Sequence, residues 1–272
     1  MRVLDRLFYH PTRTAYALPA QFGLRFEPVR FETRDRVALD AWFFPAARRE
    51  ALGTVVHFHG NAGNITAHLP HVAWLPAEGW NLFCFDYRGY GRSQGRPSRP
   101  GLIADGHAAL DYLRTRRDID PARLVVLGQS LGGAVGIVVV AERNDVAGVA
   151  VDGAFSDYQH IAAWHMRRNP LLFPFSGLVP RLMMSDGYDP IDYVSRISPR
   201  PLFIMHGRED DVVDPRMAKQ LYDAAREPKE LWLIDGVGHY CALDELADEA
   251  RPRLLAFFEK CVGRPSSVPA AE

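Results

Sequence analysis

Six short and almost wholly apolar runs place the strongest limit on how this chain can fold. They are GTVVHFHG (53–60), WNLFCFDY (80–87), RLVVLGQ (123–129), VAGVAVDG (146–153), PLFIMHG (201–207) and ELWLIDG (230–236). Strands that are covered on both faces have this pattern, as in a parallel sheet. Helix-like stretches with apolar residues at three-to-four spacing lie between them, at about 66–78, 100–117, 131–144, 215–226 and 242–260. The alternation predicts an α/β fold with a mostly parallel central sheet and helices on both faces.

The remaining segments complete a single domain of 272 residues. Two short runs, 24–34 and 37–45, are expected to pair as an antiparallel hairpin at the N-terminal edge of the sheet. The segment 158–195 is rich in aromatic residues, Met and Pro, and we interpret it as a small cap insertion. The tail 263–272, rich in Pro and Ser, is expected to be disordered.

Charge and cysteine content exclude several classes of protein. The net charge is −1, so no basic surplus indicates nucleic-acid binding. The three cysteines are too few and too scattered for a disulfide framework, which favours a reducing, cytoplasmic location. The N-terminus lacks the apolar stretch of a signal peptide. Leu4, Leu7 and Phe8 leave open a weak contact with a membrane surface or a partner, and the oligomeric state is not fixed by the sequence.

The motif GQSLGG at 128–133 interrupts a strand–helix unit and points to chemistry. In a Gly-x-Ser-x-Gly turn, the serine takes a strained backbone conformation that lifts its hydroxyl clear of the sheet. Glycine at 128 and 132 relieves clashes within the turn, and Gly133 lets the helix approach the strand. The helix N-terminus then favours negative charge beside the serine. Ser130 is therefore the predicted nucleophile.

A serine nucleophile needs a base and an orienting acid, and both should follow later strands of the sheet. His239 follows the last apolar run, and an acidic loop follows the run before it. Asp210 is the favoured acid in that loop, with Asp211 and Asp214 as alternatives. The chain order Ser130, Asp210, His239 is the order expected in this type of fold.

The loop HFHGNAGN (57–64) supplies the expected anion-binding groups. An oxyanion hole requires two N–H donors, and we predict the backbone amides of Asn61 and Leu131. We expect the substrate pocket to lie in the cap. Its candidate residues are Trp164, Leu171, Phe173, Phe175 and Met183. These side chains could form an acyl or aromatic pocket, or they could equally form the ordinary core of the cap.

Together these residues predict a serine hydrolase that cleaves a small-molecule carboxylic ester or thioester through an acyl-enzyme, with no cofactor and no metal. Peptide or amide cleavage is a less favoured variant. A non-catalytic binding module on the same fold is one competing interpretation. A metallohydrolase that gathers zinc with histidines is another; its ligands would be His57, His59, His68 and His71. Phosphate-binding loops of the G-x-x-x-x-G-K-[ST] and G-x-G-x-x-G types are lacking.

Three secondary assignments concern residues near these motifs. Asp86 and Arg88, in FDYRGYGRSQG, are expected to brace a loop through hydrogen bonds, and Tyr87 or Arg88 could contact substrate. Asp152 follows the strand at 146–153 and could border the site.

The motifs as a set resemble the Bem-like branch of the α/β-hydrolases, which includes protein depalmitoylases. The resemblance covers about residues 25–260 and rests on HFHGNAGN, FDYRGYGRSQG, GQSLGGAV, YDPIDYVSRISPRPLFIMHGREDDVV and GVGH. It implies Ser130 as nucleophile, Asp210 as acid, His239 as base and the amides of Asn61 and Leu131 as oxyanion hole. It also makes an acyl-protein thioesterase an alternative to an esterase. Many relatives carry an apolar N-terminal membrane anchor, which this N-terminus does not have.

Overall fold

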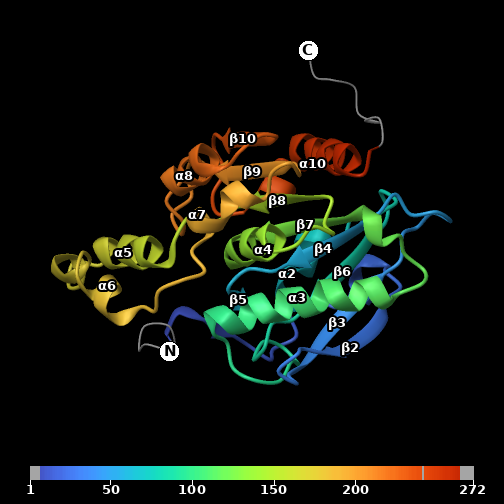
Figure 1. The fold of residues 1–272 in the computed structure, drawn as a ribbon, viewed down its shortest axis with the longest axis horizontal. Coiled ribbons are helices and arrows are strands. Elements are labelled where there is room, and N and C mark those ends of the chain that lie inside the picture. Colours follow the sequence, from blue (N-terminus) through green and yellow to red (C-terminus); the bar gives the residue numbers. More distant parts are fainter. Residues whose placement is uncertain (1–6, 241, 264–272) are drawn as a thin grey trace, which may run out of the picture.

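A computed structural model of the chain describes residues 7–240 and 242–263. Its core is one sheet with the strand order β10-β9-β8-β7-β4-β6-β3-β2 (Figure 1). The strands are β2 (Glu27–Glu32), β3 (Ala38–Phe44), β4 (Thr54–Phe58), β6 (Asn81–Phe85), β7 (Leu124–Gln129), β8 (Gly148–Asp152), β9 (Leu202–Gly207) and β10 (Lys229–Ile234). The β2–β3 and β3–β6 pairs are antiparallel, and all other pairs in this sheet are parallel. The predicted fold class and the antiparallel edge are confirmed.

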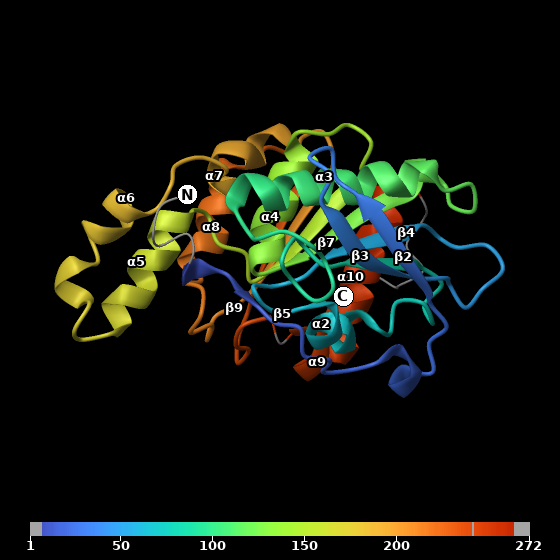
Figure 2. The same cartoon turned by 90° about the horizontal axis from the view of Figure 1, so that it is seen from below.

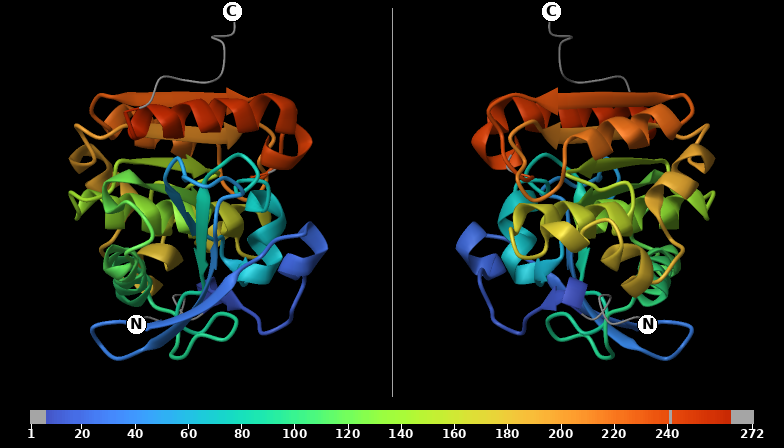
Figure 3. Two further views of the ribbon diagram at one scale, coloured as in Figure 1. Left: turned by 90° about the vertical axis from the view of Figure 1, so that its right-hand side faces the viewer. Right: turned by 90° about the vertical axis from the view of Figure 1, so that its left-hand side faces the viewer.

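Helices cover both faces of the sheet because its central strands are apolar on both faces. The main helices are α2 (Ile65–Val72), α3 (Arg99–Thr115), α4 (Leu131–Ala141), α8 (Arg216–Ala224), α9 (Ala242–Glu245) and α10 (Ala247–Cys261). One core cluster joins α3, α4 and α8 to one face, and a second joins α2 and α10 to the other. Figure 3 shows these two layers on either side of the strands. Side chains within a strand alternate between the clusters, as Val55 and Val56 of β4 do.

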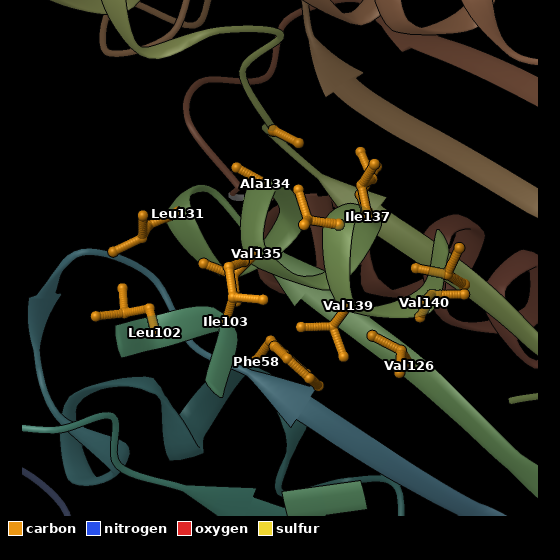
Figure 4. Packing of buried hydrophobic residues seen from close by; sticks show 14 of the residues in the cluster. Phe58, Leu102, Ile103, Val126, Leu131, Ala134, Val135, Ile137, Val139 and Val140 are labelled. Carbon is orange, nitrogen blue, oxygen red and sulfur yellow. The ribbon is translucent and has the colours of Figure 1, made fainter. Parts of the chain in front are cut away.

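Helix α4 lies at the centre of the first layer, and every residue from Leu131 to Val140 is buried. Figure 4 shows Val135 of α4 beside Leu102 and Ile103 of α3, with Phe58 of β4 close below. The start of α4 is pressed directly onto the end of β4. A Cβ at Gly132 would lie 1.9 Å from the carbonyl oxygen of Phe58, so only glycine fits there.

The segment between β8 and β9 contains five short helices and divides into two parts. They are α5 (Tyr158–Arg168), η3 (Phe173–Phe175), α6 (Val179–Met183), α7 (Pro190–Tyr193) and η4 (Val194–Arg196). Figures 1 and 2 show α5 and α6 projecting beyond the sheet. In contrast, α7 and η4 pack against α4 and α8, where Pro190 and Val194 are buried. The projecting part of the expected cap is therefore shorter than 158–195.

Two local features differ from the sequence-based expectation. The helix expected at 242–260 is divided at Leu246, where the backbone leaves the helical conformation between α9 and α10. A short parallel pair also forms between β1 (His10–Pro11) and β5 (Ala62–Gly63), although neither segment has a strand pattern. Of the small 3₁₀ segments, η1 covers Pro19–Phe22 and η2 covers Pro121–Arg123.

The N-terminal apolar patch is only partly accessible. Phe8 packs edge-on against Tyr9, Phe155 and Tyr158, whereas Leu7 is exposed. Leu4 and all of the predicted disordered tail except Gly263 lie outside the described residues. Among the helices of the described chain, we find none with the length and apolarity needed to cross a bilayer.

The contact between α4 and β4 gives a stability test. Gly132→Ala should lower the free energy of unfolding by at least about 3 kcal/mol, because the added methyl group meets backbone that cannot move aside easily. Gly136→Ala in the same helix is the matched control. Its Cβ would meet only a methyl group of Val126 at 3.2 Å, and alanine is the better helix former. The control should stay within about 1 kcal/mol of wild type in urea unfolding. Equal stability of the two variants would contradict the tight-contact explanation.

Candidate active site

Ser130 lies at the tip of the turn between β7 and α4. Its backbone has φ 51° and ψ −116°, a conformation that side-chain-bearing residues rarely adopt. The turn is held by the N–H of Ser130, which donates to the carbonyl oxygen of Asp152 at 2.8 Å. It is also crowded, because a Cβ at Gly128 would lie 2.5 Å from the carbonyl oxygen of Gly132. These contacts give a physical reason for both motif glycines.

Asp210 and His239 meet in the two loops that follow β9 and β10. The Nδ1 atom of His239 lies 2.6 Å from Oδ2 of Asp210. The other carboxylate oxygen, Oδ1, accepts the backbone N–H groups of Val212 and Val213, each at 2.8 Å. Burial alone would raise the pKa of Asp210, but hydrogen bonds from His206 and His239 outweigh it and hold this pKa well below its usual value. Asp210 is therefore a buried, ionised carboxylate.

The structure brings the imidazole of His239 against the backbone that follows β8, next to the residue that accepts the N–H of Ser130. A Cβ at Gly153 would lie 3.1 Å from the His239 ring, and the preceding residue, Asp152, accepts the N–H of Ser130. Ser130, Asp210 and His239 thus surround the end of β8, although they come from three separate loops.

The two alternative acids have other contacts. The Asp211 side chain is largely exposed and lies 3.8 Å from the Arg168 guanidinium. Asp214 is buried and binds both the backbone N–H and the guanidinium of Arg216. Only Asp210 of the three is hydrogen-bonded to His239 among the described interactions.

His206, the penultimate residue of β9, is also a member of this cluster. It is fully buried, and its Nε2 lies 3.0 Å from Oδ2 of Asp210 and 3.2 Å from the carbonyl oxygen of Val213. Asp210 thus lies between two imidazoles. The sequence signal that could have identified His206 is its position near the end of β9, four residues before Asp210 in the loop that follows.

Asp152 is a second buried carboxyl group at the carboxyl edge of the sheet. Neither of its side-chain oxygens has a hydrogen-bond partner among the described residues. Burial raises the pKa of Asp152 to about 7, and the nearby negative charge of Asp210 acts in the same direction. The expectation that Asp152 borders the site agrees with its position between Ser130 and His206.

The predicted oxyanion loop lies against the nucleophile turn. A Cβ at Gly60 would lie 3.7 Å from the carbonyl oxygen of Gln129. A Cβ at Gly132 would lie 2.6 Å from the carbonyl oxygen of His59. Leu131 is the first residue of α4, so its N–H has no acceptor within the helix. These contacts bring the backbone around Asn61 close to the N-terminus of α4.

The side chain of Asn61 anchors the N-terminal segment rather than facing the site. Its Oδ1 accepts the N–H of His10 and the hydroxyl of Tyr90, while its Nδ2 donates to the carbonyl oxygen of Phe8. The β1–β5 pair continues this attachment. The N-terminal segment therefore fixes the loop whose backbone is the predicted oxyanion donor, a role with no clear sequence signal.

Asp86 and Arg88 brace the neighbouring loops, as expected. Oδ1 of Asp86 accepts the N–H of Ile65 at the start of α2. The guanidinium of Arg88 binds the carboxylates of Asp35 and Asp105. Tyr87 is fully buried, and its hydroxyl donates to the carbonyl oxygen of His59.

The four histidines of the metallohydrolase alternative are engaged with protein groups. His57 binds the side chain of Gln129, His59 and His68 bind backbone carbonyl oxygens, and His71 binds Asp244. Burial lowers the pKa of His57 to about 3. Across residues 7–240 and 242–263, no three His, Cys, Asp or Glu side chains converge as metal ligands would.

The candidate pocket residues do not act as a group in this structure. Leu171, Phe173 and Phe175 are more than half exposed, so these three do not line an enclosed cavity. Trp164 and Met183 are partly buried. The part of the cap that approaches the site is the C-terminal half of α5, where Arg168 faces Asp211. Partial desolvation, together with the nearby Arg168 guanidinium, lowers the pKa of His165 on the same helix.

Comparisons with known proteins identify the family and the fold of the chain. A family model described as "Serine aminopeptidase, S33" matches residues 49–198. The protein YfhR of Escherichia coli K12 is 37% identical over 262 residues, 94% of this chain and 87% of YfhR. Protein bem46 of Schizosaccharomyces pombe is 29% identical over 231 residues, 84% of this chain and 75% of bem46. The esterase Pf2001 of Pyrococcus furiosus has the same fold, with a TM-score of 0.79 at 23% identity over 94% of this chain and 98% of the esterase.

The unpartnered carboxyl group of Asp152 predicts a pH dependence of stability. An unfolded Asp ionises near pH 4, whereas folded Asp152 keeps its proton until about pH 7, so its contribution to stability falls as pH rises between these values. Asp152→Asn should remove that slope. Between pH 5 and pH 7 the variant should lose about 2 kcal/mol less than wild type, because the slope is about 1.4 kcal/mol per pH unit and flattens as pH approaches the folded pKa. Urea unfolding at both pH values measures this, with exposed Asp211→Asn as the control. Parallel pH profiles for Asp152→Asn and wild type would show that the carboxyl group ionises normally.

Proposed function

This chain is an α/β-hydrolase of the Bem-like branch, and on that premise we propose that it is a serine hydrolase that cleaves carboxylic esters through an acyl-enzyme. The observation that carries the proposal is the 2.6 Å contact between His239 Nδ1 and Asp210, beside a serine with a strained backbone. Hydrolase chemistry follows from the family. The serine mechanism and the ester substrate are the proposed steps beyond it.

In this mechanism, Asp210 determines which nitrogen of His239 is the base. The ionised carboxylate accepts Nδ1–H, which leaves the lone pair of Nε2 to take the hydroxyl proton of Ser130. The Ser130 oxygen then forms a bond to the acyl carbon, and the carbonyl electrons move onto the oxygen. When the tetrahedral intermediate collapses, the leaving alcohol takes the proton from His239 and the acyl group stays on Ser130.

Water completes the cycle in the reverse sense. His239 removes a proton from water, hydroxide adds to the acyl carbon, and the proton returns to Ser130 as the carboxylic acid leaves. The oxyanion in both half-reactions is bound by the N–H groups of Leu131 and Asn61. The N-terminus of α4 supports the same charge through its aligned peptide dipoles.

His206 and Asp152 are not assigned a direct chemical step. His206 donates to Asp210 and so keeps that carboxylate ionised and oriented. Below about pH 7, Asp152 stays largely protonated, so Asp210 is the one fully ionised carboxylate of this pair.

Esters are favoured over peptides by the charges at the site entrance. An aminopeptidase must bind the protonated amino group of its substrate, for which a free carboxylate is suited. Here α5 places the Arg168 guanidinium 3.8 Å from the Asp211 carboxylate, and its positive charge opposes the binding of an ammonium group. Thioesters, including those of acyl proteins, remain within the proposal as a substrate variant because they use the same groups.

Fluorophosphonate labelling tests the nucleophile. Wild type should be labelled covalently and Ser130→Ala should not, because only a serine activated by a base reacts with this probe. Ser176→Ala is the matched control, since this cap serine is engaged with the carbonyl oxygen of Phe173. The control should be labelled like wild type. Labelling that persists in folded Ser130→Ala would disprove the assignment.

Kinetics of p-nitrophenyl esters test the acid. Asp210→Asn should lower kcat about 10⁴-fold, because an amide favours the wrong tautomer of His239. Asp211→Asn should change kcat less than threefold. A reversed result for these neighbouring variants would reassign the acid to Asp211. The same assay with esters and thioesters of increasing chain length measures the substrate preference.

A further inference from the structure

The tip of the cap exposes an unusual concentration of apolar side chains. Six of the twelve large apolar side chains that are exposed in the described chain fall between positions 171 and 182. The six are Leu171, Leu172, Phe173, Phe175, Leu178 and Leu182. Leu171 is 83% exposed, more than any other large apolar residue in the described chain. A cluster of this kind differs from the scattered exposed apolar residues of ordinary surfaces.

This cluster projects from the end of the molecule. Figures 1 and 2 show α5, α6 and the chain between them extending beyond the sheet and the other helices. A flat external surface could therefore contact the tip without meeting the body of the protein. We call residues 167–182 the cap tip.

The charge of the cap tip is positive, in contrast with the rest of the chain. The segment 158–185 contains Arg167, Arg168 and Arg181 and has no Asp or Glu, whereas the whole chain has a net charge of −1. No carboxylate pairs with Arg167 among the described residues. Arg168 keeps a contact with Asp211 at 3.8 Å, on the side toward the active site.

The positive charge and the apolar side chains of the cap tip indicate which kind of partner can bind there. A second copy of the chain would bring two arginine-rich tips together, and their charges would repel. An anionic bilayer surface attracts arginine at about 1 kcal/mol per residue near the surface, while apolar side chains enter the headgroup region. We propose that the cap tip docks the protein onto the surface of a bilayer that contains anionic phospholipid.

Docking in this way places the active site near the lipid. The C-terminal half of α5 connects the cap tip to the loop that contains Asp210 and Asp211. If the proposed esterase function holds, acyl substrates reach the site from the bilayer surface. The docking itself does not depend on catalysis, so it is tested on a protein that lacks the nucleophile.

The test is flotation of full-length Ser130→Ala with lipid vesicles. Vesicles of phosphatidylcholine with about one-third phosphatidylglycerol should bind the protein, and phosphatidylcholine alone should bind it at least tenfold more weakly. Raising the salt concentration to about 0.5 M should weaken binding to the anionic vesicles, because it screens the arginine charges.

Two pairs of variants distinguish binding through the cap tip from nonspecific adsorption to lipid. Leu171→Ser with Phe173→Ser should lower anionic-vesicle binding at least tenfold, whereas Leu18→Ser, an exposed apolar residue elsewhere, should not. Arg167→Glu should weaken binding at least fivefold, and Arg117→Glu on the body should change it less than twofold. Unchanged thermal unfolding would show that the variants remain folded.

Three results would overturn the proposal. They are no binding to anionic vesicles, equal binding by the cap-tip and control variants, or a dimer in solution that Phe173→Ser dissociates while vesicles bind nothing. The same cap-tip substitutions in the Ser130 protein should leave hydrolysis of a short soluble ester within twofold of wild type. Loss of vesicle binding with retained soluble activity would separate docking from the proposed chemistry.

Discussion

The close approach of two backbones at Gly132 is the constraint on which the rest of the site depends. At this point the first turn of α4 rests on the carbonyl oxygen of Phe58, with no room for a side chain. The contact sets the position of α4 against β4. Ser130 is then held at a positive φ, and the loop after β4 lies beside the N-terminus of α4. One steric requirement therefore positions both the proposed nucleophile and the proposed oxyanion donors.

Two carboxyl groups at the ends of neighbouring strands have opposite ionisation preferences. Asp210 accepts two backbone N–H groups and is adjacent to two imidazoles, so its charge is stabilised despite burial. Asp152 is equally enclosed but has no donor among the described residues, so burial favours its protonated form. This separation of pKa values by environment is a common property of hydrolytic sites. Below about pH 7, it leaves Asp210 as the one fully ionised carboxylate of this pair.

The segment between β8 and β9 combines a structural part and an exposed part. Its second half, α7 and η4, completes the packing around α4. Its first half reaches out with apolar and cationic residues, yet remains connected to the site through Arg168 and Asp211. A short insertion can thus change what approaches the active site without altering the sheet that supports it.

Much of the fold was predictable because it follows from local patterns. Continuous apolar runs indicated the parallel strands, and the alternating run near the N-terminus indicated the antiparallel edge. The division of the last helix at Leu246 and the β1–β5 pair were not predictable, because both depend on contacts between distant segments. The exposure of Leu171 and Phe173 was not predictable either, because apolar composition alone does not distinguish a pocket from a projecting tip.

The sequence by itself determined the strand–turn–helix around Ser130, because each of its glycines answers a steric demand within a few residues. It also brought Asp210 and His239 to the same edge of the sheet, because parallel strands end together. Tertiary structure alone decided that Asp210 rather than Asp211 faces His239, and that His206 joins them. The physical reason is that a loop's turn sets the direction of each side chain. That turn is fixed by hydrogen bonds and burial contributed by other parts of the chain.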